Sequence, residues 1–247
     1  MGYTRPAPIG QKAICRVRPE DACNLITFRA GIAKLGTTVH LSQMKAEDVI
    51  PTYERVGEVW AKQRNRNLME RPWLDRLLTM APRSTGKVRV LDLGCGSGQP
   101  IGTYFAERGA RLTGVDATTT MTQLYAQNVP SAEVIQADMR GLMLDATFDA
   151  IIAWNSFFHL NADDQRGMFG TFAALAAPRA TLMFTSGHIA GEAIGEIADA
   201  PIYHASLAAE EYRALLNDNG FKVLRYAPED PTCGNHTIWL AQNRNTA

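Results

Sequence analysis

Val88-Arg-Val-Leu-Asp-Leu-Gly-Cys-Gly-Ser-Gly98 is the stretch of this sequence that decides the fold. Its first half is mostly apolar and predicts a short buried strand that ends next to an acid, Asp92. Three glycines follow at alternate positions: Gly94, Gly96 and Gly98. Glycine accepts positive φ and lets a ligand approach the backbone closely. The stretch therefore predicts a strand, a tight turn and a helix that together cradle a nucleotide-like ligand.

The acid before the glycines narrows the type of ligand. A dinucleotide site has the spacing Gly-x-Gly-x-x-Gly and places a pyrophosphate on the helix N-terminus. Here Asp92 precedes a Gly-x-Gly-x-Gly run, which favours a ligand with a positively charged end. This spacing counts against a nicotinamide-dependent oxidoreductase, which stays as the weaker alternative.

The stretch resembles the first motif of class I S-adenosylmethionine-dependent methyltransferases. Gly114-Val-Asp116 resembles the end of that family's second strand, and Gln136-Ala-Asp138-Met139 resembles the end of its third. The run from Phe148 to His159 resembles its fourth strand and the loop that faces the transferred methyl group. The resemblance covers roughly residues 49–243. It implies an enzyme that transfers a methyl group from S-adenosylmethionine to a small-molecule acceptor by in-line displacement, releasing S-adenosylhomocysteine.

The resemblance also implies a set of cofactor-binding residues. Asp92 and the glycine turn correspond to the family's contacts with the amino-acid end, and Asp116 corresponds to the acid that binds both ribose hydroxyls. Asp138 corresponds to the partner of the adenine amino group, and Met139 packs on the ring. A helix cap is the alternative role of Asp116 and Asp138. The implied cofactor set in this part of the chain is Asp92, Gly94, Gly96, Asp116, Ala117, Asp138, Met139 and Trp154.

Residues 46–63 carry apolar side chains at helical spacing and predict an amphipathic helix. Tyr53, Trp60 and Arg64 lie on this helix or just after it. They resemble the N-terminal helix that closes over the cofactor in small-molecule methyltransferases, where arginine suits a carboxylate. The alternative is that Tyr53 and Trp60 belong only to the core face of the helix.

The candidate catalytic residues are Asn155 and His159. Methyl transfer mainly needs proximity and alignment, and a base is needed only when the acceptor is protonated. Asn155 lies where the family often places a residue near the methyl group, and His159 is a candidate base. A structural histidine is the alternative for His159. The sequence predicts no metal site.

Two further polar clusters are candidates for the acceptor side. The first is an insertion at residues 186–206, which contains Ser186, His188, Glu192, Tyr203 and His204. Its glycines, Gly187, Gly191 and Gly195, suit a mobile loop. The second runs from Glu229 to His236. Together they favour a small polar acceptor, which the residues alone do not identify as an amine, a carboxylate or a hydroxyl compound.

Strand and helix patterns alternate from residue 88 to residue 242, which predicts an α/β fold with a parallel sheet covered on both faces. We expect strands near 88–93, 111–116, 132–137, 148–154, 180–185, 221–227 and 236–242. We expect the main helices near 99–108, 119–128, 163–176 and 207–218. The resemblance implies a Rossmann-like three-layer sandwich with a seven-stranded, mostly parallel sheet of order 3-2-1-4-5-7-6.

Composition and length agree with one domain and bound its partners. The chain has 247 residues, with 25 Lys and Arg against 25 Asp and Glu. This neutral balance indicates neither a nucleic-acid nor a membrane surface, and no apolar run approaches ~18 residues. The four cysteines include no Cys-x-x-Cys pair and no histidine partner at metal spacing, so we expect a reduced, cytoplasmic protein. The oligomeric state is not readable.

The chain divides into an extension and a domain. Residues 1–43 lack periodicity and are broken by prolines and glycines, which predicts a poorly structured N-terminal extension. Our hypothesis is that the natural protein starts at Met44. Residues 44–247 are expected to form a single methyltransferase domain, with cap helices at 44–80. A non-catalytic S-adenosylmethionine-binding protein on the same fold, or an enzyme that acts on a macromolecule, are alternatives to the small-molecule enzyme.

Overall fold

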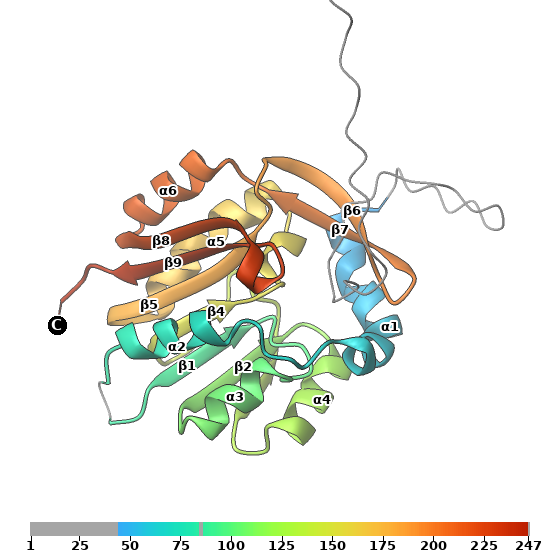
Figure 1. Cartoon of the computed structure of the whole chain (residues 1–247), viewed down its shortest axis with the longest axis horizontal. Helices are drawn as coiled ribbons and strands as arrows, with labels where there is room; N and C mark the ends of the chain where they lie inside the picture. The colour runs from blue at the N-terminus through green and yellow to red at the C-terminus, as the bar shows by residue number, and fades with distance from the viewer. Residues whose placement is uncertain (1–43, 84–85, 247) are drawn as a thin grey trace, which may run out of the picture.

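The computed structural model describes residues 44–83 and 86–246 (Figure 1). The predicted extension at residues 1–43 lies outside the described residues. No helix among the described residues is long and apolar enough to cross a membrane.

Seven strands form one sheet. They are β1 (Arg89–Leu93), β2 (Arg111–Asp116), β3 (Glu133–Gln136), β4 (Phe148–Ala153), β5 (Ala176–Ser186), β8 (Phe221–Asp230) and β9 (His236–Asn243). The strand order is β3-β2-β1-β4-β5-β9-β8, and β9 runs antiparallel to both of its neighbours. This is the expected order once the two hairpin strands β6 and β7 are left out of the count, so the fold prediction is confirmed.

Helices cover both faces of the sheet. They are α1 (Val49–Gln63), α2 (Arg71–Met80), α3 (Ile101–Glu107), α4 (Thr119–Asn128), α5 (Ala162–Leu175) and α6 (Ala209–Asp218), with short 3-10 turns η3 (Ala46–Asp48), η4 (Phe157–His159) and η5 (Pro231–Cys233). Helices α2, α3 and α4 lie on one face, and α5 and α6 lie on the other (Figure 1). The expected helices agree with α3 to α6 within two residues at each end.

The two cores follow from strand geometry. Successive side chains of a strand point to opposite faces, so Val90 packs with Trp73 and Phe105 of the α2 and α3 layer. Its neighbour Leu91 packs on the other side with Phe169 of α5. All five of these apolar side chains are buried on strands or helices that an apolar pattern identified. The central strands pair in parallel, so their carboxyl ends meet at one edge of the sheet.

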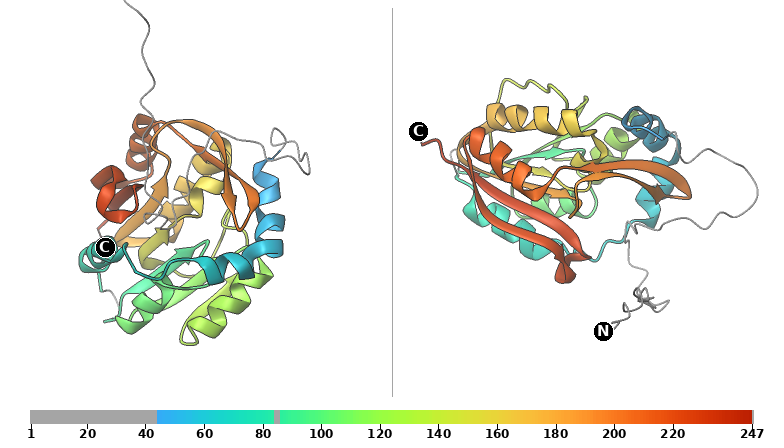
Figure 2. Two further views of the ribbon diagram at one scale, coloured as in Figure 1. Left: turned by 45° about the vertical axis from the view of Figure 1, so that its right-hand side comes forward. Right: turned by 90° about the horizontal axis from the view of Figure 1, so that it is seen from above.

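A third apolar cluster lies beyond that edge. Helix α1 contributes Val49, and the hairpin of β6 (Gly191–Ile197) and β7 (Ala200–Ser206) contributes Ile197, Ile202 and Tyr203. Figure 2 shows α1 and this hairpin together beside the strand ends. Helix α1 and the hairpin therefore share one apolar contact that lies apart from the two cores of the sheet.

The expectation of a mobile loop at residues 186–206 is wrong. Gly191 to Ile197 pairs antiparallel with Ala200 to Ser206 in a continuous register. The chain reverses at Ala198 and Asp199, whose φ values are 45° and 62°. Two successive left-handed residues give the backbone twist that a tight hairpin needs. An Ala-Asp pair is not the usual signal for such a turn, which is why the sequence pattern failed to indicate it.

Candidate active site at the strand ends

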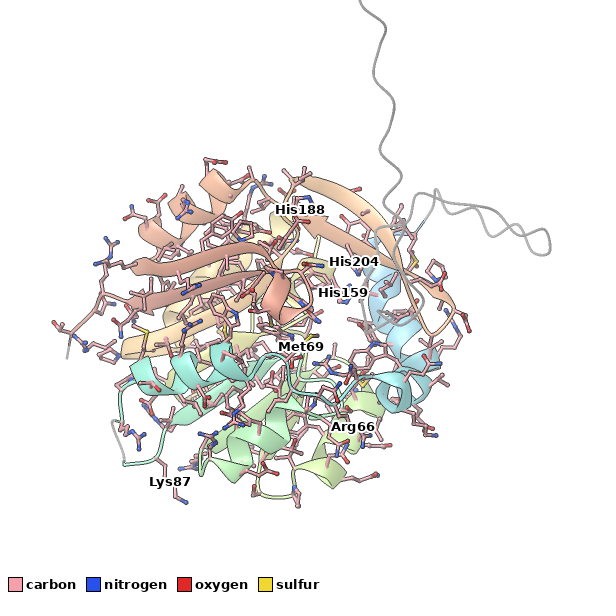
Figure 3. All side chains as sticks on the ribbon, viewed as in Figure 1. Arg66, Met69, Lys87, His159, His188 and His204 are labelled. Atoms are coloured by element: carbon pink, nitrogen blue, oxygen red, sulfur yellow. The ribbon has the colours of Figure 1, made fainter. Side chains whose placement is uncertain are left out.

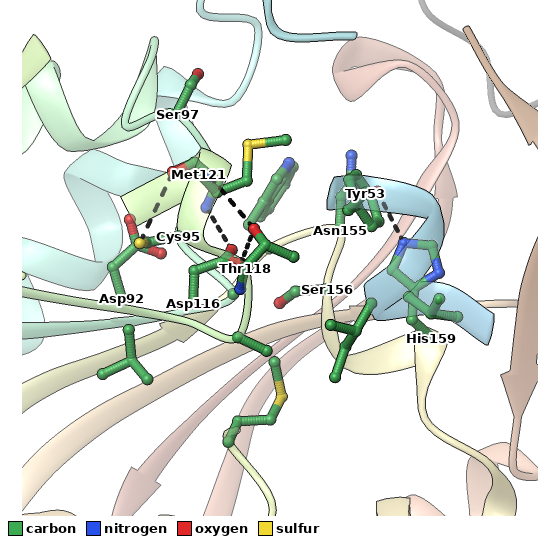
Figure 4. Close-up of a pocket in the computed structure, with 18 of the residues that line it drawn as sticks. Tyr53, Asp92, Cys95, Ser97, Asp116, Thr118, Met121, Asn155, Ser156 and His159 are labelled. Atoms are coloured by element: carbon green, nitrogen blue, oxygen red, sulfur yellow. Dashed lines mark hydrogen bonds between the residues drawn. The ribbon is translucent and has the colours of Figure 1, made fainter. Parts of the chain in front are cut away.

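One pocket at the carboxyl ends of β1, β2 and β4 is lined by every residue that the sequence analysis singled out for the cofactor and for catalysis. We call it the strand-end pocket. Figure 4 shows Asp92, Asp116 and Thr118 on one side of it and His159 on the other. The residues that the structure brings together here are Tyr53, Trp60, Arg64, Asp92, Gly94, Gly96, Asp116, Ala117, Asp138, Met139, Trp154, Asn155 and His159.

The glycine turn needs its glycines for two reasons. Gly94 and Gly96 have φ values of 66° and 56°, a region that other residues adopt at a cost. A Cβ on Gly94 would also lie 2.2 Å from Cβ of Ser156. A Cβ on Gly96 would instead face the Trp60 ring at 3.6 Å across the pocket. The turn is therefore packed tightly against Ser156 on one side and faces the pocket and α1 on the other.

Asp116 joins the glycine turn to the start of α4. Its carboxylate accepts hydrogen bonds from the Gly96 N–H at 3.0 Å, the Thr118 N–H at 3.0 Å and the Thr118 hydroxyl at 2.9 Å. Thr118 is the N-cap of α4 and accepts from the Met121 N–H, so the helix-cap alternative for Asp116 is wrong. Burial raises the pKa of Asp116 above its usual value. The buried carboxylate thus gains from each further hydrogen-bond donor that approaches it.

Asp92 is the most deeply placed acid of the pocket, with 4% of its surface exposed. Burial raises the pKa of its carboxyl to about 7, the nearby Arg64 lowers it, and Asp116 raises it further. A carboxyl in this state is only partly ionised near neutral pH. A positively charged group that entered the pocket would complete its ionisation.

Asp138 is held by a salt bridge. Its two oxygens accept hydrogen bonds from the Arg140 guanidinium at 2.6 to 3.0 Å, and Arg140 also contacts Asp164 at 3.0 Å. Partial burial raises the pKa of Asp138, but the hydrogen bonds and charge of Arg140 hold it below its usual value. Residues 139–147 contain no helix, so the helix-cap alternative is also wrong here. Arg140 is a pocket residue that sequence reasoning missed.

Helix α1 forms the outer wall of the pocket. Tyr53 and Trp60 contact each other edge to face with ring centroids 5.7 Å apart, and the Arg64 guanidinium lies 5.4 Å from the Trp60 ring centroid. Arg64 also contacts Glu70 at 3.4 Å. The buried Nε of Arg64 has no hydrogen-bond partner among the described residues. A buried donor without a partner costs free energy, so this one is suited to an acceptor supplied by a ligand.

The same helix is fastened to α4 by Glu54. The Glu54 carboxylate accepts hydrogen bonds from the Thr119 N–H at 2.6 Å and from the Thr120 N–H at 3.1 Å. Both amides belong to the first turn of α4, where helix N–H groups lack partners within the helix. Glu54 was not singled out from the sequence because its partners lie far along the chain. The contact holds α1 over the glycine turn.

The hydrogen bonds of His159 favour the structural role over the candidate role as a base. Its Nδ1 donates to the Tyr203 carbonyl at 2.9 Å, so the Nε2 lone pair accepts from the Tyr53 hydroxyl at 3.1 Å. Burial lowers the pKa of His159 to about 4, which leaves the ring neutral and weakly basic. The geometry instead makes His159 a positioning residue for Tyr53. His204 lies beside it, with ring centroids 4.9 Å apart (Figure 3).

Asn155 lies between the strand-end pocket and a second cavity. Its φ is 52°, and its backbone N–H donates to the Thr185 hydroxyl at 2.8 Å. Its side-chain amide donates to Nε2 of His236 at 2.9 Å. Asparagine adopts this left-handed region more readily than most other non-glycine residues. Asn155 lines both the strand-end pocket and a second cavity beside it.

The second cavity lies under the β6–β7 hairpin, and we call it the hairpin cavity. Its volume is about 560 Å³. Both polar clusters from the sequence contribute side chains to this cavity, with the exception of Tyr203. The Tyr203 hydroxyl donates to Glu192 at 2.7 Å, and its carbonyl accepts from His159. Polar side chains that line it are Asn155, Ser186, His188, Glu192, His204, Ser206, Glu229, Asn235, His236 and Thr237.

Comparisons of sequence find matches to methyltransferases in the central part of the chain. The sequence model of a family described as a methyltransferase domain matches residues 90–179. The O-methyltransferase rstn1 of Aspergillus nomiae is 25% identical over 158 residues, which is 59% of this chain and 69% of that protein. The putative methyltransferase YqeM of Bacillus subtilis is 40% identical over 70 residues, which is 27% of this chain and 28% of that protein.

Solved structures share the fold. A magnesium protoporphyrin IX methyltransferase from Synechocystis with bound S-adenosylhomocysteine superposes with a TM-score of 0.61 at 17% identity, covering 80% of this chain and 99% of that one. CalS10, an amino pentose methyltransferase from Micromonospora echinaspora with bound S-adenosylmethionine, gives 0.58 at 18% identity, covering 78% and 96%. At this identity the likeness shows the fold alone. Residues 90–179 therefore match a methyltransferase domain, and the chain as described has the fold of methyltransferases that were solved with S-adenosylmethionine or S-adenosylhomocysteine bound.

Proposed function

We propose that this chain transfers a methyl group from S-adenosylmethionine to a small-molecule acceptor and releases S-adenosylhomocysteine. One observation carries the proposal: three acids from the ends of three neighbouring strands, Asp92, Asp116 and Asp138, line one pocket around a glycine turn. The cofactor has an ammonium group, a ribose diol and an adenine amino group, and all three are hydrogen-bond donors. The relatives named above are methyltransferases, which supports the same reaction class.

Each acid of the pocket suits a different donor of the cofactor. Asp92, buried and with a raised pKa, suits the ammonium group, because that charge completes its ionisation. Asp116 accepts both ribose hydroxyls beside Ala117, since a carboxylate can accept two hydrogen bonds side by side. Asp138 and Met139 hold the adenine at the far end, where Asp138 accepts the amino group in place of one of its hydrogen bonds from Arg140.

The wall formed by α1 completes the site. The buried Nε of Arg64, which has no partner among the described residues, receives the carboxylate of the cofactor's amino-acid end. Tyr53, held by His159, and Trp60 cover the pocket and exclude water. The ring nitrogen of Trp154 is a second buried donor without a partner among the described residues and faces the same pocket. These unsatisfied groups support a ligand with both anionic and polar parts.

The residues need to supply alignment more than acid–base chemistry. The bound cofactor supplies an electrophilic methyl group on a sulfonium that is already a good leaving group. Asn155, at the boundary of the two cavities, orients the acceptor toward that methyl group. Alignment of this kind lowers a barrier by up to ~7–11 kcal/mol in favourable intramolecular models.

The domain limits and the setting are part of the proposal. We propose that residues 44–247 act as one methyltransferase domain, with α1 as its cap and residues 186–206 as its acceptor-side insertion. Helix α2, which we also expected in a cap at residues 44–80, packs on one face of the sheet instead. A chain starting at Met44 should bind the cofactor as tightly as the full chain. Cys95 and Cys233 are free thiols, which supports a reducing, cytoplasmic location.

Calorimetric titration of the full chain tests the function directly. We expect S-adenosylmethionine and S-adenosylhomocysteine to bind with micromolar dissociation constants, and NAD, as the control, not to bind. A chain that binds NAD but neither sulfur ligand would overturn the proposal. A chain that binds S-adenosylmethionine but forms no S-adenosylhomocysteine with any acceptor would instead be a binding protein on an enzyme fold.

A further inference from the structure

The hairpin cavity is placed to receive the methyl acceptor. Its volume of about 560 Å³ lies within the range of small-molecule sites. Asn155 lines both this cavity and the strand-end pocket, so the two spaces meet at one side chain. A molecule in the hairpin cavity therefore has one end at the outer opening and the other end beside Asn155.

The charges of the hairpin cavity have one sign. Among the described residues that line it, Glu192 and Glu229 are the carboxylates, and none is Lys or Arg. Both side chains are exposed at the rim. Glu192 accepts a hydrogen bond from Tyr203, and Glu229 lies 3.6 Å from Nδ1 of His188. Carboxylates without a guanidinium or ammonium partner attract cations and repel anions.

The inner end of the cavity carries no formal charge but offers a proton acceptor. Nδ1 of His236 donates to the Cys233 carbonyl at 2.7 Å, which leaves the lone pair on Nε2. That nitrogen accepts the side-chain amide of Asn155 at 2.9 Å, at the junction of the two spaces. Burial lowers the pKa of His236, so the ring is neutral at neutral pH. The ring is fixed against Trp154 with centroids 5.3 Å apart.

We propose that the hairpin cavity binds an acceptor with an ammonium group facing Glu192 and Glu229 at the rim and a proton-bearing nucleophile facing Nε2 of His236 at the inner end. This inference rests on the proposed methyl-transfer function. It excludes acceptors whose rim end is a carboxylate or a phosphate. It also narrows the polar acceptor that the sequence left open to one charge class.

The assignment gives a balanced reaction. The nucleophilic atom of the acceptor forms a bond to the methyl carbon, while the bond between that carbon and sulfur breaks. The electron pair of the broken bond stays on sulfur, which becomes the neutral thioether of S-adenosylhomocysteine. The nucleophile takes the place of the Asn155 amide at Nε2 of His236, and its proton passes to that nitrogen and from there to solvent. The ammonium group at the rim is unchanged.

A matched set of three phenols tests the charge class. The full chain, saturated with S-adenosylhomocysteine, is titrated with tyramine, para-ethylphenol and para-hydroxyphenylpropionate, which differ in the charge at one end. A single charge pair at an exposed rim contributes little, but attraction of one ligand and repulsion of the other add up. We therefore expect tyramine to bind about 10-fold tighter than the propionate. A propionate that binds equally or more tightly overturns the inference, and so does a cavity that binds none of the three.

Charge-removing variants locate the effect. The double variant Glu192→Gln/Glu229→Gln should bring the dissociation constants of tyramine and the propionate to within about twofold of each other. The control double variant Glu107→Gln/Glu133→Gln removes two exposed carboxylates elsewhere on the molecule and should leave the ranking intact. An equal effect of the two double variants would place the selectivity in the overall charge of the protein and refute the rim assignment.

A second comparison tests the inner end. Tyramine should bind about fivefold tighter than its methyl ether, because only the free phenol donates to Nε2 of His236. His236→Phe keeps a ring against Trp154 and should abolish that preference. If His236→Phe still binds tyramine more tightly than the methyl ether, the assignment of His236 is wrong. It is also wrong if the unaltered chain binds the two compounds equally. Failure of the chain to bind S-adenosylhomocysteine at the outset would count against the proposed function instead.

Discussion

The strand-end pocket and the hairpin cavity meet at Asn155, yet the chain builds them in different ways. In the strand-end pocket, Asp92, Asp116 and Asp138 each lie at or next to the end of a strand, and the parallel sheet brings them together. In the hairpin cavity, the polar groups come from three distant segments and depend on an antiparallel hairpin and on the loop before β9. The first arrangement follows from short motifs, and the second follows from tertiary packing.

We expect the largest effect from a substitution in the glycine turn of the strand-end pocket. Gly94→Ala puts a Cβ 2.2 Å from Cβ of Ser156 at a φ of 66°, so both crowding and backbone strain oppose it. We expect the free energy of unfolding to fall by about 3 kcal/mol and cofactor binding to be lost. Urea unfolding and calorimetry measure the two effects.

Gly109→Ala is the matched control, because its φ is 75° but a Cβ there meets nothing within 4 Å. It should cost only about 1 kcal/mol and leave binding unchanged. Equal costs at Gly94 and Gly109 would show that crowding at the turn contributes nothing.

Asp116→Asn should weaken cofactor binding next most strongly. The amide keeps the size of the side chain but loses the charge and one acceptor. Hydrogen bonds to charged groups contribute about 1.5–3 kcal/mol, so the dissociation constant of S-adenosylhomocysteine should rise about 30-fold. Asp218→Asn, at the exposed end of α6, is the control. An unchanged dissociation constant for Asp116→Asn would remove the ribose role.

The pH dependence of binding sharpens the role of Asp92. Its carboxyl has a pKa of about 7 in the free protein, and a bound ammonium group favours the ionised form. Below pH 7 the carboxyl must lose a proton to bind, so affinity should fall about tenfold between pH 8 and pH 6. Calorimetry at pH 6 in buffers of different ionisation enthalpy should also register proton release. Asp92→Asn should flatten the profile, whereas a steep profile in that variant would point to another group.

The same shift predicts how the free protein responds to pH. Because the folded-state pKa lies above the usual value of 3.8, the stability that the protonated Asp92 contributes is lost as pH rises through about 7. The midpoint temperature of thermal unfolding should therefore rise most in Asp92→Asn, relative to the unaltered chain, above pH 7.

The smallest effect is expected where α1 is fastened. Glu54→Gln weakens the contacts with the Thr119 and Thr120 amides and should speed dissociation of S-adenosylhomocysteine about threefold, since an exposed contact of this kind contributes less than 1 kcal/mol. Stopped-flow displacement measures this rate. Glu58→Gln, one turn further along the same helix and paired with Lys62 on the surface, should leave it unchanged. Equal acceleration in both variants would assign the effect to the charge of the helix.

Apolar runs and glycine turns are local signals, so the sequence predicted the strands and a mostly parallel sheet. The strand order was implied by the resemblance to the methyltransferase family and agrees with the structure. The sequence also indicated which residues line the strand-end pocket, although their contacts with a cofactor stay predictions. Two things lay beyond it. The Ala198-Asp199 reversal carries no glycine or asparagine, so the hairpin was read as a loop. The state of His159 depends on Tyr203, 44 residues away, whose carbonyl fixes its tautomer.

The contact between Val49 of α1 and Ile197 and Ile202 of the hairpin bears on the order of events in a turnover. One helix walls the strand-end pocket and also supports the roof of the hairpin cavity. If α1 must swing away for S-adenosylhomocysteine to leave, the hairpin loses its apolar support at the same time. The methylated product can leave through the rim while α1 stays in place. We therefore expect ordered release, with the methylated product first and S-adenosylhomocysteine last.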